Sequence, residues 1–292
     1  MATQVLVLTA ASGISDGAAE MIVDAGRAAG GVLGAPRRLA ASAVEVEVET
    51  APEAGAFETA AADISIDANV VPAEGRRKRL LIADMDSTII GVECIDELAD
   101  FAGVKPMVAE ITERAMRGEL DFEAALRARV ALLRGLPVSA LEECYAARVH
   151  LNPGARALVR TMTALGADTA LISGGFTFFT SRVAAAAGFA HNQANTLLAE
   201  DGALTGEVSD PILGREAKHA ALLRLANGFG PEAAIAVGDG ANDLDMVVAA
   251  GLGVAYKAKP ALAVAADARI DHSDLTALLA LQGIPESDWV RD

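Results

Sequence analysis

From residue 80 to residue 256, short apolar runs alternate with longer segments whose apolar residues recur at helical spacing. Strands that alternate with helices in this way predict an α/β fold, with a Rossmann-like parallel sheet covered by helices on both faces. Ligands bind such sheets beyond the carboxyl ends of the strands. The expected strands are residues 80–83, 169–173, 234–237 and 252–256, and the expected helices are residues 154–165, 177–187, 215–226 and 242–250.

The segment at about 92–150 interrupts this alternation, because it has helical patterns and no clear strand. An insertion directly after the first strand lies above the carboxyl edge of the sheet, where a helical cap can act as a lid. A second insertion, at about 195–208, places an acidic-glycine turn between two short runs, which predicts a β-hairpin. The expected cap helices are residues 95–102, 107–118, 122–133 and 139–149.

Residues 1–72 have a different pattern, in which strands and helices alternate as β-α-β-α-β, and we expect a small, separate α+β domain. Valine and glutamate alternate strictly over residues 44–49, as in a strand with one face in water. The other expected elements are strands at 4–8 and 64–71 and helices at 15–29 and 54–62. Residues 73–79, which follow Pro72 and contain a glycine and several charges, are the expected linker to a second domain at 80–292.

The formal net charge of −16 argues against nucleic acid or an anionic membrane as a partner. The basic run at 76–79 is the local exception, and we interpret it as a solvated linker and not as a recognition patch. Two cysteines without metal-type spacing fit a reducing compartment. The sequence has no signal-peptide pattern and no apolar run long enough to span a membrane, so we expect a cytoplasmic protein.

The apolar run at 80–83 leads directly into two aspartates, Asp84 and Asp86. Positions i and i+2 of a strand share a side, so both carboxylates can converge at the strand end. Two close carboxylates repel each other unless a cation or a shared proton separates them. A hard divalent ion such as Mg²⁺ suits oxygen ligands of this kind, although a turn or helix-capping aspartate pair would give the same short motif.

Three further signals lie at or after the predicted strands. Asp239 follows residues 234–237 and is followed by Asn242 and Asp243, which open a helix; Asp243 is expected to hold a metal ligand or a lysine in place. Ser173 and Gly174 offer a hydroxyl and a backbone N–H for an anion. Lys218 supplies a cation among these acids.

Taken in this order, DMDST, Ser173-Gly174, Lys218 and GDGAND resemble the haloacid dehalogenase-like (HAD) phosphatase superfamily over residues 80–281. The cap sequences at 93–99, 114–122 and 129–130, together with the hairpin at 194–208, resemble the phosphoserine phosphatase family within it.

This resemblance implies that Asp84 is a nucleophile that forms an aspartyl-phosphate, and that Asp86 is the general acid and base. It also implies that Mg²⁺ is held by Asp84, Asp239 and the backbone carbonyl of Asp86.

By the same resemblance, Ser173, the Gly174 amide and Lys218 would stabilise the phosphoryl oxygens, and Asn242 would contact the phosphate site. Glu93 would pair with the ammonium of phosphoserine, and Arg129 would bind its carboxylate. Met116 and Phe122 would line the lid, although packing between cap and core would explain them equally well.

The implied activity is Mg²⁺-dependent hydrolysis of O-phospho-L-serine, the last step of serine biosynthesis. The alternatives are a phosphatase for another small molecule, a phosphotransferase to homoserine or another alcohol, and an inactive amino-acid-sensing regulator. The N-terminal order resembles an ACT-like domain in topology only; amino-acid binding, homodimer formation and simple covering of a surface remain open for it.

Overall fold

The computed structural model describes residues 4–116 and 119–291, and its centre is a six-stranded parallel sheet in the order β13-β12-β11-β6-β7-β8. The α/β fold predicted from the sequence is therefore confirmed. The two edge strands were not predicted, because β8 is polar (HNQAN) and β13 has only three residues, so neither forms an apolar run that stands out in the sequence. The strands are β6 (Leu80–Ala83), β7 (Asp168–Phe176), β8 (His191–Asn195), β11 (Ala234–Gly238), β12 (Leu252–Tyr256) and β13 (Ala268–Ile270).

Both faces of this sheet are apolar and covered by helices, which explains why β6, β11 and β12 are continuous apolar runs. Leu80 and Ile82 of β6 point into the core formed with α9, α10 and α11, whereas Leu81 and Ala83 point into the core formed with α7, α8 and α12. These helices are α7 (Ala155–Ala164), α8 (Thr177–Ala187), α9 (Arg215–Leu225), α10 (Leu244–Ala249), α11 (Pro260–Ala265) and α12 (Ala277–Leu281).

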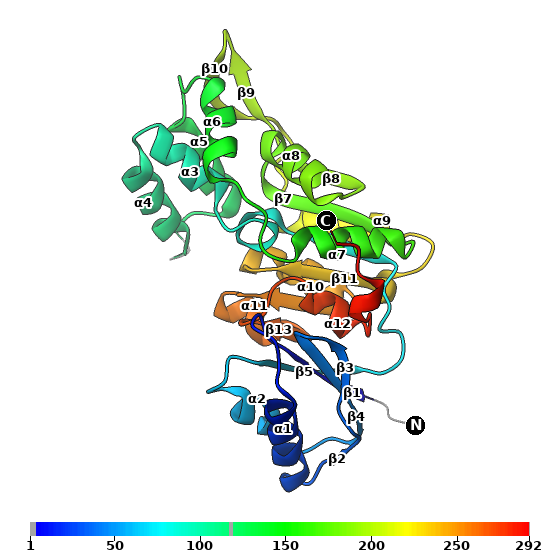
Figure 1. The fold of residues 1–292 in the computed structure, drawn as a ribbon. Helices are drawn as coiled ribbons and strands as arrows, with labels where there is room; N and C mark the ends of the chain where they lie inside the picture. The colour runs from blue at the N-terminus through cyan, green and yellow to red at the C-terminus, as the bar shows by residue number, and fades with distance from the viewer. Residues whose placement is uncertain (1–3, 117–118, 292) are drawn as a thin grey trace.

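The segment after β6 forms a helical cap that lies beyond one end of the sheet (Figure 1). The predicted hairpin is also present, as the antiparallel pair β9 (Leu197–Glu200) and β10 (Ala203–Val208). The cap helices are α3 (Cys94–Phe101), α4 (Lys105–Met116), α5 (Phe122–Ala131) and α6 (Ser139–Arg148). The last two residues expected in the second cap helix, 117 and 118, lie outside the described residues. None of the helices in the described parts of the chain has the length and apolarity needed to cross a membrane.

The N-terminal residues form an antiparallel sheet in the order β2-β4-β1-β5, with β3 paired to β4. One face packs on α1 and α2, and the other packs on α12 of the core. This domain and the cap lie at opposite ends of the molecule (Figure 1). Two short strands, β2 and β3, were not predicted. The elements are β1 (Gln4–Thr9), α1 (Asp16–Ala28), β2 (Val32–Leu33), β3 (Arg37–Ala40), β4 (Ala43–Thr50), α2 (Ala56–Ala61) and β5 (Asp67–Pro72).

The glutamate face of β4 is not entirely in water, contrary to the sequence prediction. Glu45 is 8% exposed and forms ion pairs with Arg37 and Arg76, while Glu47 and Glu49 are exposed as expected. The prediction was wrong at Glu45 because this end of the strand faces the core domain, which a period-2 pattern cannot register.

The basic run at 76–79 is only partly solvated: Arg77 and Arg79 are exposed as expected, whereas Arg76 and Lys78 are half-buried. Arg76 donates to Glu45 at 3.0 Å and to the carbonyls of Ala280 and Leu281. The Lys78 ammonium donates to two carbonyls of the core at 2.9 and 3.0 Å. These side chains fasten the segment to the core because their long stems reach carbonyl groups left free at the ends of helices and strands.

Side chains of β5 join the N-terminal domain to the neighbouring strand of the core sheet. Asn69 accepts from the Arg269 amide at 2.7 Å and donates to the Arg269 carbonyl at 2.9 Å. The buried Asp67 carboxylate accepts from the amides of three consecutive residues, Asp271, His272 and Ser273, at 2.8–3.2 Å. Removing Asp67 would leave these amides without their partner, which is costly in a buried position.

We therefore expect Asp67→Ala to lower the free energy of unfolding by about 2–4 kcal/mol, because charge-assisted hydrogen bonds are lost and backbone donors remain unsatisfied. Urea unfolding followed by circular dichroism measures this change. Asp63→Ala is the matched control, since Asp63 is an exposed aspartate of the same domain. Equal unfolding midpoints for the two variants would contradict this role of Asp67.

Candidate active site

Asp84 stands directly after β6, in the middle of the sheet. The residue is 3% exposed. Oδ1 accepts from the Met85 amide at 2.7 Å and from the Lys218 ammonium at 2.7 Å. The only hydrogen bond of Oδ2 with the described residues comes from the Asn242 amide nitrogen at 3.5 Å. One oxygen is therefore fixed, and the other remains available for chemistry.

Asp86 lies two residues further on, in an irregular turn at 85–89, and is also buried. Oδ1 accepts from the Cys94 amide at 2.9 Å, and Oδ2 accepts from the Ser173 hydroxyl at 3.3 Å. Burial, assisted by the negative charge of Glu93, raises the pKa of Asp86 to about 7. A carboxyl group of this kind can give up a proton and take it back near neutral pH.

Gly174 and Gly175 lie within β7, whereas the sequence predicted that this strand ends at Ser173. β7 continues to Phe176 because Asn195 of β8 holds the Gly174 carbonyl at 2.8 Å, and α8 then begins at once. The second glycine is required sterically, since a Cβ at Gly175 would lie 2.6 Å from Oδ2 of Asp86.

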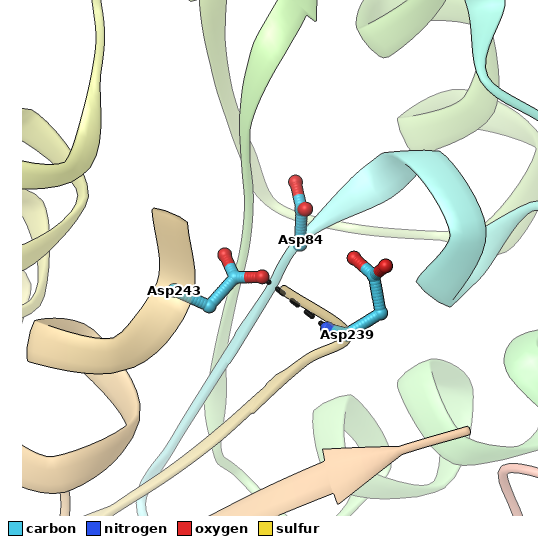
Figure 2. A group of neighbouring side chains, drawn as sticks. All are labelled: Asp84, Asp239 and Asp243. Atoms are coloured by element: carbon cyan, nitrogen blue, oxygen red, sulfur yellow. Dashed lines mark hydrogen bonds between the residues drawn. The ribbon is translucent and has the colours of Figure 1, made fainter. Parts of the chain in front are cut away.

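Two more carboxylates follow β11, and Figure 2 shows them beside Asp84. One carboxylate oxygen from each of Asp84, Asp239 and Asp243 lies within 4.8 Å of the other two. Both oxygens of Asp243 are already engaged: Oδ1 accepts from Lys218 at 2.6 Å, and Oδ2 accepts from the Asp239 and Gly240 amides at 3.2 Å. Asp243 therefore fixes the loop that carries Asp239, as its expected supporting role requires.

Lys218 is the cation that this cluster depends on. It is 1% exposed and bridges Asp84 and Asp243. Burial alone would lower the pKa of the Lys218 ammonium, but the two carboxylates outweigh burial and raise it. Burial and the charge of Asp243 raise the pKa of Asp84 well above its usual value, and Lys218 acts in the opposite direction.

The carboxylate oxygens of Asp84 and Asp239 that Lys218 does not hold fit a divalent cation. Oδ2 of Asp84 and the carboxylate of Asp239 are buried oxygen donors, and burial raises the pKa of Asp239. A cation between them would offset charge that the protein only partly neutralises, since the exposed Lys259 approaches Asp239 no closer than 3.5 Å. Carboxylate oxygens without cysteine or histidine favour a hard ion.

A cavity of about 340 Å³ opens above these groups, and the cap forms its other wall. Glu93 and Arg129 both line it, so the structure brings the predicted recognition residues to the predicted chemical ones. Phe122 lines it too, beside Gly174, whereas the Met116 side chain lies outside the described residues. The predicted site residues that line this cavity are Asp84, Asp86, Glu93, Arg129, Ser173, Gly174, Asp239 and Asn242.

Sequence reasoning missed four residues here. Ser87 supports Glu93 through a 2.7 Å hydrogen bond, and its positive φ of 55° has no sequence signal. Gly175, Asp96 and Lys259 line the cavity. Two of them had a usable signal: Asp96 is one helical turn after Glu93, and Lys259 follows a predicted strand on the carboxyl side.

The carboxyl-edge site and the cap are matched by the sequence model of the haloacid dehalogenase-like hydrolases, which covers residues 81–247; a second model of the same description covers residues 216–279. The chain belongs to the haloacid dehalogenase-like hydrolases, and the resemblance stated from the motifs is confirmed.

Within this family the chain is similar to phosphoserine phosphatases. It is 46% identical to the enzyme of Streptomyces coelicolor over 245 residues, which is 82% of this chain and 60% of the relative. It is 47% identical to the enzyme of a Polaromonas species over 210 residues, which is 70% of this chain and 89% of the relative. The chain thus spans less than two thirds of the first relative and most of the second.

Solved structures give the same result. A probable phosphoserine phosphatase from Vibrio cholerae in unliganded form superposes with a TM-score of 0.82 and 32% identity, over 98% of this chain and 88% of that one. A phosphoserine phosphatase solved as an analogue of the phospho-aspartyl intermediate has a TM-score of 0.65 and 39% identity, over 70% of this chain and 98% of that one.

Lys218→Met should lower the free energy of unfolding at pH 8 by about 3–5 kcal/mol, because two buried carboxylates lose their cation. The pKa of Asp84, which burial already raises, would rise further in the folded state, so the folded protein would bind more protons than the unfolded chain. The difference from wild type should therefore shrink as the pH falls to 5.

Denaturant unfolding at both pH values measures this effect. Lys105→Met is the control, because its side chain is half exposed and lies 3.9 Å from Glu97. A Lys218→Met penalty that is the same at both pH values would contradict the electrostatic account.

Proposed function

We propose that the protein is an Mg²⁺-dependent phosphatase that hydrolyses O-phospho-L-serine through an aspartyl-phosphate on Asp84. One observation carries this proposal: the two aspartates at the end of β6 and the charged cap residues Glu93 and Arg129 line the same cavity. The cavity floor can act on a phosphate ester while the cap wall binds an amino acid.

In the first step, an oxygen of Asp84 attacks phosphorus as the bond from phosphorus to the serine oxygen breaks. Asp86 gives its proton to that departing oxygen, a role supported by its pKa of about 7. We assign stabilisation of the negative phosphoryl oxygens to the Ser173 hydroxyl, the Gly174 amide and the Lys218 ammonium.

In the second step, the Asp86 carboxylate takes a proton from water, whose oxygen attacks phosphorus and releases the Asp84 carboxylate and phosphate. Asp84 and Asp239, with the backbone carbonyl of Asp86, would hold Mg²⁺, which when bound offsets the charge of the phosphoryl group. Asn242, 3.5 Å from Oδ2 of Asp84, keeps that oxygen oriented.

Recognition of phosphoserine is assigned to the cap. Glu93 offers a carboxylate for the α-ammonium, and Arg129 offers a planar pair of donors for the α-carboxylate. The relatives named phosphoserine phosphatase support this substrate. The cytoplasmic location expected from the sequence and a homodimer through the N-terminal domain are compatible with this function and stay predictions.

Phosphotransfer to homoserine or another alcohol is the alternative with the same first step. Only the group that attacks the intermediate differs. The relatives support the hydrolase over the transferase. The intact set of acids and Lys218 argues against an inactive sensor.

Phosphate release from O-phospho-L-serine should require Mg²⁺ and stop with EDTA. It should fall at least about 1,000-fold in Asp84→Asn, because the amide cannot act as the nucleophile. Colorimetric phosphate release, run with and without homoserine, measures this. Asp63→Asn is the control. A phosphorylated homoserine product with little free phosphate would show a transferase instead, and full activity of Asp84→Asn would exclude the mechanism.

A further inference from the structure

Two charged groups in the cavity are not paired with the protein. The Asp96 carboxylate has no hydrogen bond or ion pair with any described residue. Among the described residues, the Arg129 guanidinium donates only to the Ala125 carbonyl of its own helix, at 3.3 Å. Both groups are half-buried and line the same cavity. Charges that are partly removed from water without a partner are costly, so such groups are expected where a ligand supplies the partner.

Asp96 lies on the same side of α3 as Glu93, since the two are three residues apart at the start of the helix. The Ser87 hydroxyl holds Oε1 of Glu93 at 2.7 Å and so limits the directions in which this carboxylate can turn. Two carboxylates of one helical turn thus face the same cavity without a protein cation within 4 Å of either in the described chain. A small cation between them would relieve their repulsion.

Burial and the charge of Glu93 raise the pKa of Asp96, and Arg129 acts in the opposite direction. Burial lowers the pKa of Arg129, and Asp96 opposes this more than Glu93 does. Asp96 thus interacts electrostatically with both Glu93 and Arg129, and all three residues line the same cavity.

We infer that Asp96 is a specificity-determining residue: together with Glu93 it forms a two-carboxylate receptor for the ammonium group of the substrate. This inference rests on the proposed function and deepens it. It makes the protein selective for phosphate esters that carry an amine close to the ester, and it assigns Arg129 alone to the carboxylate. An uncharged or anionic substituent at the ammonium position would leave two acids facing each other.

The test uses three esters that separate the two groups: O-phospho-L-serine, O-phosphoethanolamine, which lacks the carboxylate, and the phosphate ester of 3-hydroxypropanoate, which lacks the amine. Asp96→Asn keeps the size of the side chain and removes its charge. Asp100→Asn is the matched control, because Asp100 is an exposed residue of the same helix outside the cavity. Asp96→Glu tests whether a carboxylate restores the wild-type behaviour.

We expect Asp96→Asn to raise KM at least about tenfold for both amine-bearing esters, since a charge-assisted contact is lost. kcat should change little, because the contact is the same before and during the reaction. KM for the ester without the amine should not rise, and Asp96→Glu should recover part of the loss for the amine-bearing esters only.

Two patterns would overturn the inference. A rise in KM for both carboxylate-bearing esters that spares O-phosphoethanolamine would mean that Asp96 acts through Arg129. No change, or an equal change for all three esters, would mean that Asp96 does not read the amine. Failure of the proposed function would appear differently, as a wild-type protein with no preference for O-phospho-L-serine over the ester without the amine.

Discussion

The site depends on one electrostatic constraint, the crowding of buried carboxylates at the carboxyl edge of the sheet. Asp84, Asp86, Asp239 and Asp243 are each less than 9% exposed, and Lys218 is the buried cation that touches two of them. This single ammonium fixes one oxygen of Asp84 and one of Asp243, so the positions of both strand ends are tied to α9. The negative charge that remains favours the binding of a divalent ion and the protonation of Asp86. Both effects support the transfer of a phosphoryl group.

The sheet and the cap supply different kinds of group to the site. Groups at the strand ends are buried and hydrogen-bonded in fixed positions, which suits bond making and breaking. Groups on the cap, by contrast, are half-buried and partly unpaired, which suits binding a substrate that brings its own charges. The two sets share a cavity because the cap is inserted directly after the strand that carries Asp84. A change of substrate in such a fold can therefore be made in the cap without disturbing the charges around Lys218.

Local patterns predicted the central strands and the residues at their ends, because a strand buried on both faces and a polar group at its end are both visible in a short window. The same short patterns gave wrong or missing predictions where the structure depends on contacts with residues that are distant in the sequence. Nothing near Glu45 shows that the core domain covers it, and the polar strand β8 forms only because β7 offers it a hydrogen-bonding partner. The spacing of Asp96 from Glu93 is visible in the sequence, but that Asp96 has no partner among the described residues is seen only in the structure.

The junction between β5 and β13 has a consequence for how this molecule meets other copies of itself. A short strand at the end of a parallel sheet normally offers a row of free amides and carbonyls to which a foreign strand can add. Here the side chains of Asn69 and Asp67 already occupy both groups of Arg269 and the next amides in line. The N-terminal domain thus ends the core sheet with side chains in place of another strand, so the sheet cannot be extended on that side into a fibre or a strand-exchanged assembly.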